Sequence, residues 1–257
     1  MCGISVIYVI IKNKKKGVGM LQYRYAMFDL DGTLVDTMKY WRNVMYECAQ
    51  LKGITDLTED IKENLQKMTC ASGAEYIKSV CENKDLCVFT REDILSLMEY
   101  HYVNHTQLKV GVIELLEYLK SRGVKMCIVS ATPGKLVNIA LQTANISEYF
   151  EYILTTDDFP KGKQDAEIFN EVLRRFDSKP HETAVFEDAY YSIKNAVSLG
   201  FYVIGIEDYY ERRFKDKIIS LSDEYYENWL QFDFGKSFDD PGSKTVKELY
   251  PEYEKKH

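Results

Sequence analysis

The chain has 257 residues, of which 46% are hydrophobic and 28% are charged. This balance is typical of a folded globular protein and argues against disorder over most of the chain. The formal net charge of −7 argues against a nucleic-acid partner, whose binding needs a clustered basic surface.

Residues 1–19 contain an apolar run, Ile4 to Ile11, that is followed by four lysines. The run is too short to cross a bilayer, and a signal peptide carries its positive charge before the apolar stretch. Lys16 to Gly19 can be encoded by a purine-rich ribosome-binding sequence at a plausible distance from the Met20 codon. We interpret residues 1–19 as a translated leader or, alternatively, a disordered tail, and we expect no membrane partner.

Residues 20–36 form the first part of the predicted core. Tyr23 to Phe28 is a short apolar and aromatic run, which is typical of a buried strand. Residues 37–108 differ, because they show helical patterns and no convincing strand. We therefore expect residues 37–108 to form a helical cap inserted into the core.

Residues 109–224 alternate between short apolar runs and helical patterns. Such alternation predicts an α/β fold with a parallel sheet covered on both faces, and ligands bind such sheets beyond the carboxyl ends of the strands. The expected strands are 124–129, 152–154, 183–186 and 201–206, and the expected helices are 112–122, 136–144, 166–176 and 190–199. Residues 225–257, aromatic and charged, are expected to form a C-terminal extension that packs on the surface or frays.

Two aspartates, Asp29 and Asp31, follow the first predicted strand and precede Gly32. Side chains two residues apart in a strand point the same way, so both carboxylates can face one pocket. One carboxylate can attack phosphorus to form an aspartyl-phosphate, and the other can protonate the leaving oxygen and later deprotonate water. The alternative of a solvated acidic turn stays open for this segment alone. A calcium loop is excluded because the further ligand-spaced acids are missing.

Three more segments, together with the one that contains Asp29 and Asp31, form a set of four motifs. FDLDGTLVD resembles the signature of the haloacid dehalogenase superfamily, and the motifs that follow occur in the order of that family. Ser130 ends the VKMCIVS run, Lys163 lies in GKQDAEIF, and Glu187 and Asp188 follow the run TAVF. The resemblance covers about Tyr23 to Ile206 and implies a three-layer Rossmann-like core with an inserted helical cap.

The resemblance also implies the roles of the site residues. Asp29 is the nucleophile, and Asp31 transfers the proton. Mg²⁺ is held by the side chains of Asp29 and Asp188 and the backbone carbonyl of Asp31, with Glu187 acting through a metal-bound water or as a supporting residue. The phosphoryl group is bound by Lys163, Ser130, the backbone amide of Leu30 and Thr33, which also orders the turn after the acids.

The residues favour one reaction among those of the superfamily. Dehalogenases lack the second acid, whereas Asp31 is present here. β-Phosphoglucomutases carry a histidine in a D-T-x-x-x-H pattern, where this chain has Trp41. Hydrolysis of a small phosphorylated metabolite is therefore favoured, with a mutase as the alternative. A non-catalytic binding module is less favoured, because it should have lost Asp29 or Asp31.

The cap is expected to select the leaving group. In helical-cap members of the superfamily a cap loop closes over the site, and Thr69 to Gly73 is the expected loop. It is weakly polar and has no arginine, so it gives no preference for a strongly anionic leaving group.

The cysteines indicate the compartment. Six occur without a C-x-x-C pair or a histidine cluster, which argues against a zinc site and is typical of reduced thiols. We expect a cytoplasmic monomer or homodimer. The cysteines are Cys2, Cys48, Cys70, Cys81, Cys87 and Cys127.

Overall fold

The computed structural model describes residues 23–54, 57–68, 70–80 and 89–233, together with Thr245 and Glu248. Residues 1–19, expected to be a leader or tail, lie outside the described residues. The strands are β1 (Tyr25–Phe28), β2 (Lys125–Val129), β3 (Phe150–Leu154), β4 (Thr183–Glu187), β5 (Tyr202–Ile206) and β6 (Glu224–Tyr226). The α-helices are α1 (Met38–Leu51), α2 (Glu59–Leu65), α3 (Cys70–Val80), α4 (Arg91–His105), α5 (Val112–Ser121), α6 (Gly134–Thr143), α7 (Ala166–Phe176), α8 (Tyr190–Ser198) and α9 (Lys215–Leu221).

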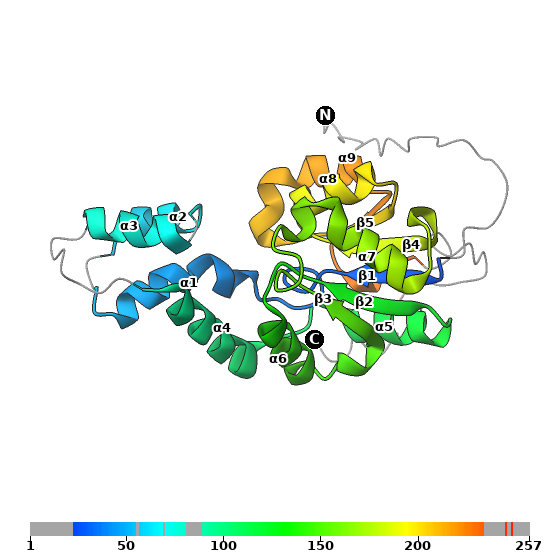
Figure 1. The fold of residues 1–257 in the computed structure, drawn as a ribbon, viewed down its shortest axis with the longest axis horizontal. Helices are drawn as coiled ribbons and strands as arrows, with labels where there is room; N and C mark the ends of the chain where they lie inside the picture. Colours follow the sequence, from blue (N-terminus) through cyan, green and yellow to red (C-terminus); the bar gives the residue numbers. More distant parts are fainter. Residues whose placement is uncertain are drawn as a thin grey trace, which may run out of the picture.

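The six strands form one sheet in the order β3-β2-β1-β4-β5-β6, and every neighbouring pair is parallel. β1 lies in the centre, where Tyr25 is in register with Lys125 of β2 and Thr183 of β4. Parallel strands need crossover helices, and these cover both faces of the sheet (Figure 1). The predicted α/β fold is confirmed.

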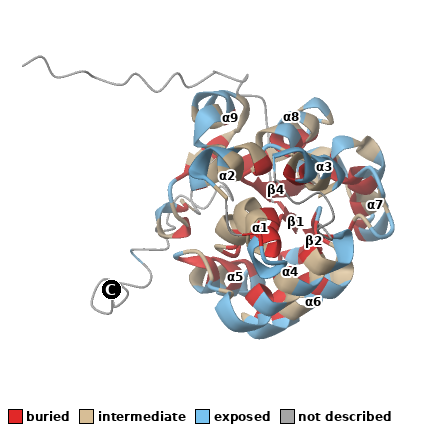
Figure 2. Ribbon diagram, turned by 90° about the vertical axis from the view of Figure 1, so that its left-hand side faces the viewer, coloured by how far each residue is buried: buried red, intermediate tan, exposed pale blue. Residues whose placement is uncertain are grey.

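Alternate residues of β1 belong to opposite faces of the sheet, as the period of a strand requires. Met27 packs in one hydrophobic cluster with residues of α7, α8 and α9. Phe28 packs in the other, with residues of α5 and α6, and stacks on Phe186 with ring centroids 4.2 Å apart. Figure 2 shows buried residues on the strands and on the inward sides of the helices. The central strands are thus enclosed on both faces, which fixes the position of the residues that follow them.

Helices α1–α4 lie between β1 and α5, and the described residues of this segment contain no strand. We call these four helices the helical insert (Figure 1). The segments that enter and leave it run side by side, because Val35 and Leu108 form an antiparallel bridge. The N–H of Asp36 donates to the carbonyl of Gln107 at 2.8 Å, and that of Lys109 donates to the carbonyl of Leu34 at 2.9 Å. The chain therefore enters and leaves the insert at neighbouring positions on the core.

The segment after Glu224 departs from the expectation that it would lie on the surface or fray. Residues 224–226 form the edge strand β6, and Trp229 and Phe232 are fully buried. The Trp229 ring lies against Phe186 with centroids 5.6 Å apart, and its Nε1–H donates to the carbonyl of Thr33 at 2.9 Å. The expectation was wrong for these residues, because their large apolar rings complete the core beside β4.

No helix in the described part of the chain has the length and apolar character needed to cross a membrane.

Candidate active site

The expected site residues gather at the carboxyl edge of the sheet. Asp29 directly follows β1 and Ser130 directly follows β2. Glu187 is the last residue of β4, and Asp188 comes next. Lys163 lies in a short 3-10 helix, η2 (Gly162–Gln164), between β3 and α7. Because all these strands are parallel, their carboxyl ends share one edge, and residues from distant parts of the sequence meet there.

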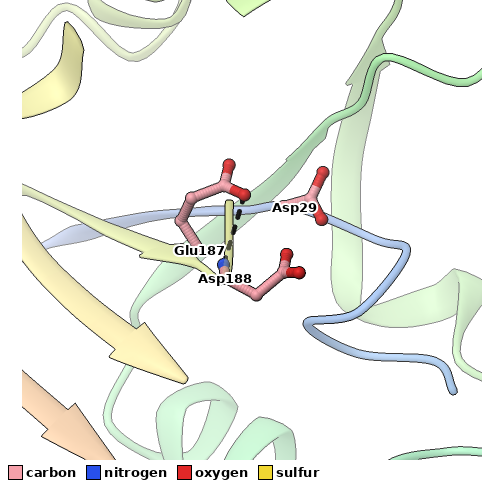
Figure 3. Close-up of side chains that lie close together, drawn as sticks. All are labelled: Asp29, Glu187 and Asp188. Atoms are coloured by element: carbon pink, nitrogen blue, oxygen red, sulfur yellow. Dashed lines mark hydrogen bonds between the residues drawn. The ribbon is translucent and has the colours of Figure 1, made fainter. Parts of the chain in front are cut away.

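Three carboxylates form the centre of the site. Asp29, Glu187 and Asp188 each place one carboxylate oxygen within 4.8 Å of the others (Figure 3). Their residues are 6%, 1% and 2% exposed, respectively. Burial, with a contribution from Glu187, raises the pKa of Asp29 to about 7. Burial and the nearby Asp29 also raise the pKa of Asp188 well above its ordinary value. Such a group of buried acids needs positive charge to hold it together.

Lys163 supplies part of that charge. It is 3% exposed, and its Nζ contacts Oδ1 of Asp29 and lies 2.6 Å from Oε2 of Glu187. Burial lowers the pKa of Lys163, but Asp29 and Glu187 outweigh this effect and raise the pKa well above its ordinary value. The backbone carbonyl of Lys163 accepts a hydrogen bond from the amide of Asn195 at 3.0 Å. The ammonium is therefore fixed beside the expected nucleophile.

Glu187 has both carboxylate oxygens engaged. Oε2 accepts from Lys163 and from Oγ of Ser192 at 2.7 Å. Oε1 accepts from the backbone N–H groups of Asp188 and Ala189 at 3.2 and 3.0 Å. Figure 3 shows the bond between Glu187 and the Asp188 amide as a dashed line. With four donors around it, Glu187 is placed to orient Lys163, which suits the expected supporting role better than direct metal binding.

Asp29 and Asp188 remain the best candidates to hold a divalent cation. They directly follow two different strands, β1 and β4, and offer carboxylate oxygens, the ligands that Mg²⁺ prefers. Oγ1 of Thr33 donates to Oδ1 of Asp188 at 3.0 Å, so Thr33 orients this carboxylate and does not line the pocket. Gly32 has φ +89°, and a Cβ there would lie 2.4 Å from Oδ2 of Asp188. The donor set and the glycine turn fit a small hard cation between β1 and β4.

Asp31 is held by three hydroxyl donors. Thr37 Oγ1 lies 2.5 Å from Oδ1, Tyr102 contacts the same oxygen, and Thr132 Oγ1 lies 2.7 Å from Oδ2. Nε1 of Trp41 donates to the Tyr102 hydroxyl at 2.9 Å. Thr37, Trp41 and Tyr102 come from the helical insert or its first connection, so the insert positions the expected proton-transfer residue.

Sequence reasoning missed Thr132 and Tyr102. Thr132 lies two residues after Ser130 at the end of β2, and this spacing was a usable signal. Tyr102 is 71 positions from Asp31 and lies in α4, where no local pattern marks it.

The two expected phosphate-binding groups nearest Asp29 also lie at this edge. Ser130 is 1% exposed, lines the pocket, and accepts the N–H of Thr132 on its Oγ at 3.0 Å. Leu30 buries its side chain, and its carbonyl accepts the N–H groups of Thr33, Leu34 and Val35. These bonds fix the backbone after Asp29. The role of the Leu30 amide stays a prediction.

A pocket of about 260 Å³ opens above these residues. Its wall from the helical insert comes from α1, through Met38, Trp41 and Arg42. The expectation that Thr69 to Gly73 forms a selecting loop was wrong, because Cys70 to Gly73 belongs to α3 and does not line the pocket; Thr69 lies outside the described residues. The lining residues are Asp29, Asp31, Met38, Trp41, Arg42, Ser130, Ala131, Thr132, Lys163, Glu187, Asp188, Ala189, Tyr191 and Glu211.

Comparison with known proteins found a matching family and similar sequences. The sequence model of a family described as haloacid dehalogenase-like hydrolase matches residues 26–206. A phosphorylated carbohydrates phosphatase of Thermotoga maritima is 26% identical over 175 residues, covering 68% of this chain and 81% of that protein. A β-phosphoglucomutase of Bacillus subtilis is 26% identical over 224 residues, covering 80% of this chain and 96% of that protein.

A solved structure shares the fold. CbbY from Rhodobacter sphaeroides, in complex with phosphate, superposes with a TM-score of 0.63 at 20% identity. The match covers 80% of this chain and 95% of that chain.

Proposed function

The chain belongs to the haloacid dehalogenase-like hydrolases, and from this membership and the geometry of the site we propose that it is a Mg²⁺-dependent phosphatase of small phosphorylated metabolites. The observation that supports this most is the position of Asp29, in contact with Lys163 and beside the acid pair Glu187 and Asp188 at the base of the pocket. Phosphoryl transfer to a carboxylate requires a nucleophile, a cation and a cluster of acids in the same pocket.

Asp29 is the proposed nucleophile. Its carboxylate forms a bond to phosphorus while the bond from phosphorus to the leaving oxygen breaks, which gives an aspartyl-phosphate. Lys163 holds this carboxylate and offers positive charge to the phosphoryl oxygens. Ser130 lies at the same pocket wall, and its hydroxyl donates a hydrogen bond to one of those oxygens.

Asp31 carries the proton in both halves of the proposed reaction. It protonates the leaving oxygen in the first half and accepts a proton from the attacking water in the second, when the bond from Asp29 to phosphorus breaks. Thr37, Tyr102 and Thr132 hold its carboxylate at a fixed position for both transfers.

Mg²⁺ is the proposed cofactor. Asp29 and Asp188 would hold it, with Thr33 fixing the orientation of Asp188. When bound, the ion offsets the repulsion between the acids and the phosphate and stabilises the charge of the transferring group.

The test is release of phosphate from p-nitrophenyl phosphate with Mg²⁺ present and after its removal with EDTA. We expect Asp29→Asn to abolish Mg²⁺-dependent release while the circular dichroism spectrum stays that of the wild type. Acid quenching in the steady state should trap a phosphoprotein in the wild type and none in Asp29→Asn. Full activity in Asp29→Asn would overturn the assignment of the nucleophile.

A mutase is the second candidate, because the chain covers 96% of the B. subtilis β-phosphoglucomutase. The position of the mutase histidine is Trp41 here, and its Nε1–H is directed to Tyr102. An indole N–H is a donor only and does not exchange protons as an imidazole does. We therefore expect no conversion of β-glucose 1-phosphate to glucose 6-phosphate, and observed conversion would favour the mutase.

A further inference from the structure

An ion pair joins the two walls of the pocket. Arg42 comes from α1 of the helical insert, and Glu211 comes from the 3-10 helix η4 (Tyr209–Phe214) that follows β5 in the core. Nη2 of Arg42 lies 3.2 Å from Oε1 of Glu211, and both residues line the pocket. Their side chains are 23% and 11% exposed. The pair is more enclosed than a surface ion pair and less screened by solvent.

Each partner is also fixed from its own side. Nη1 of Arg42 donates to the carbonyl of Gln66 at 3.3 Å, within the helical insert. Oε2 of Glu211 accepts the backbone N–H of Tyr190 at 3.4 Å, within the core. The pocket wall therefore presents a guanidinium donor and a carboxylate acceptor side by side in a preset geometry. Ligand binding to such a pair costs little ordering of the protein.

The charge of the pocket opposes a second anionic group on the substrate. Five carboxylates line it, from Asp29, Asp31, Glu187, Asp188 and Glu211. Two cations face them, those of Lys163 and Arg42, so the formal net charge of the lining is −3. A bound Mg²⁺ would change the formal net charge of the pocket to −1.

The two cations are both already paired. Lys163 is engaged by Asp29 and Glu187, and Glu211 neutralises Arg42. A carboxylate or second phosphate on the leaving group would have to approach Glu211, and none of the described lining residues offers it a free cation. The pocket therefore favours an uncharged leaving group.

The remaining lining residues near this pair are apolar or aromatic. Met38 and Trp41 come from α1, and Tyr191 comes from α8. Apolar walls with a few fixed polar groups favour a ligand that has carbon-bearing faces and hydroxyl groups at its edges. A hydroxyl both donates and accepts, so two hydroxyls can use Arg42 as donor and Glu211 as acceptor.

We propose that Arg42 and Glu211 determine specificity by binding hydroxyls of an uncharged polyol. The substrate class is then the monophosphate esters of sugars or similar polyols. This inference rests on the proposed phosphatase function and names the kind of leaving group that the same site accepts.

The test compares four phosphate esters with the wild-type protein and Mg²⁺: glucose 6-phosphate, 6-phosphogluconate, fructose 1,6-bisphosphate and p-nitrophenyl phosphate. We expect kcat/KM for glucose 6-phosphate to exceed that for 6-phosphogluconate and the bisphosphate by about tenfold. Glu211→Gln should lower the ratio of kcat/KM for glucose 6-phosphate to that for p-nitrophenyl phosphate by about tenfold, mainly through KM. The same variant should gain activity on 6-phosphogluconate, because Arg42 is then no longer neutralised.

Glu99→Gln is the matched control. Glu99 of α4 pairs with Lys135 of α6 at 2.5 Å, and this ion pair also joins the insert to the core but does not line the pocket. It should leave the substrate ratio unchanged. An equal change of that ratio in Glu99→Gln and Glu211→Gln would mean that a loosened insert, and not hydroxyl binding, causes the effect, and would overturn the proposal.

A wild-type preference for 6-phosphogluconate or the bisphosphate would also overturn it, as would hydrolysis of p-nitrophenyl phosphate without hydrolysis of glucose 6-phosphate. These results leave the proposed phosphatase function standing. That function fails separately, if the wild type releases no phosphate from p-nitrophenyl phosphate with Mg²⁺.

Discussion

Asp29→Asn should stabilise the metal-free protein while it removes activity. In the folded chain Asp29 lies among buried acids, and burial with the nearby Glu187 raises its pKa from 3.8 to about 7 in spite of Lys163. In the unfolded chain the carboxyl returns to its ordinary pKa. The folded state therefore binds a proton more tightly than the unfolded state does, and ionising Asp29 costs folding free energy.

The size of the effect follows from the shift. One pKa unit corresponds to about 1.4 kcal/mol, so a rise from 3.8 to about 7 corresponds to about 4 kcal/mol. This part of the stability is present below about pH 4, where Asp29 is neutral in both states, and is lost as the pH rises to about 7. Asparagine is neutral at every pH and avoids the loss. At pH 8 the variant should gain about 4 kcal/mol, or about 10 °C in Tm.

The assay is thermal unfolding in EDTA at several pH values from 5 to 8. The Tm advantage of Asp29→Asn should grow with pH, and added Mg²⁺ should raise the Tm of the wild type but not of the variant. Asp165→Asn is the matched control, since Lys161 and the helix N-terminus lower the pKa of Asp165 and the sign is reversed. An Asp29→Asn protein that melts at or below the wild type at pH 8 in EDTA would refute the reasoning.

Two further substitutions test the turn after β1 and the C-terminal segment. Gly32→Ala should lower the free energy of unfolding by about 1–2 kcal/mol because of the positive φ at this position, and it should displace Asp188, whose Oδ2 would lie 2.4 Å from the new Cβ. A Mg²⁺ titration followed by Tm should then show weaker metal binding, and unchanged binding would contradict the proposed metal site. Trp229→Phe removes the hydrogen bond to the Thr33 carbonyl and part of a fully buried ring. The free energy of unfolding measured in urea should therefore fall by about 2–3 kcal/mol. A fall below about 0.5 kcal/mol would mean that this segment does not support the core.

The core of the fold and the centre of the site could be predicted because their signals are local. Each of the strands β1 to β5 contains a short apolar run, and the acids that matter follow directly after such runs. The edge strand β6, Glu224–Tyr226, has no such run and was not expected. Parallel pairing then brings the strand ends together whatever the loops do. That is why Asp29, Lys163 and Asp188 were found from the sequence and meet in the structure.

The rest of the pocket depends on how the helical insert and the C-terminal segment pack on the core. No local sequence pattern predicts this packing. Arg42 and Tyr102 lie on helices whose patterns predict a helix and nothing about its neighbour. Glu211 is one acid in a charged stretch until the fold places it opposite Arg42. Trp229 looked like part of a surface tail because its partner Phe186 is 43 positions earlier in the chain, a separation that only tertiary packing closes.

The bridge between Val35 and Leu108 has a consequence for how such proteins diverge. Since the helical insert leaves and returns at neighbouring residues, the core does not have to stretch or bend to carry it. A recombination event can exchange one insert for another of different length with the sheet intact. If Asp31 transfers the proton as proposed, the exchanged insert has to supply a hydroxyl donor to Asp31, as Tyr102 does here. Within that requirement, the insert can change the pocket wall that it supplies, here Met38, Trp41 and Arg42, while the core residues of the pocket stay in place.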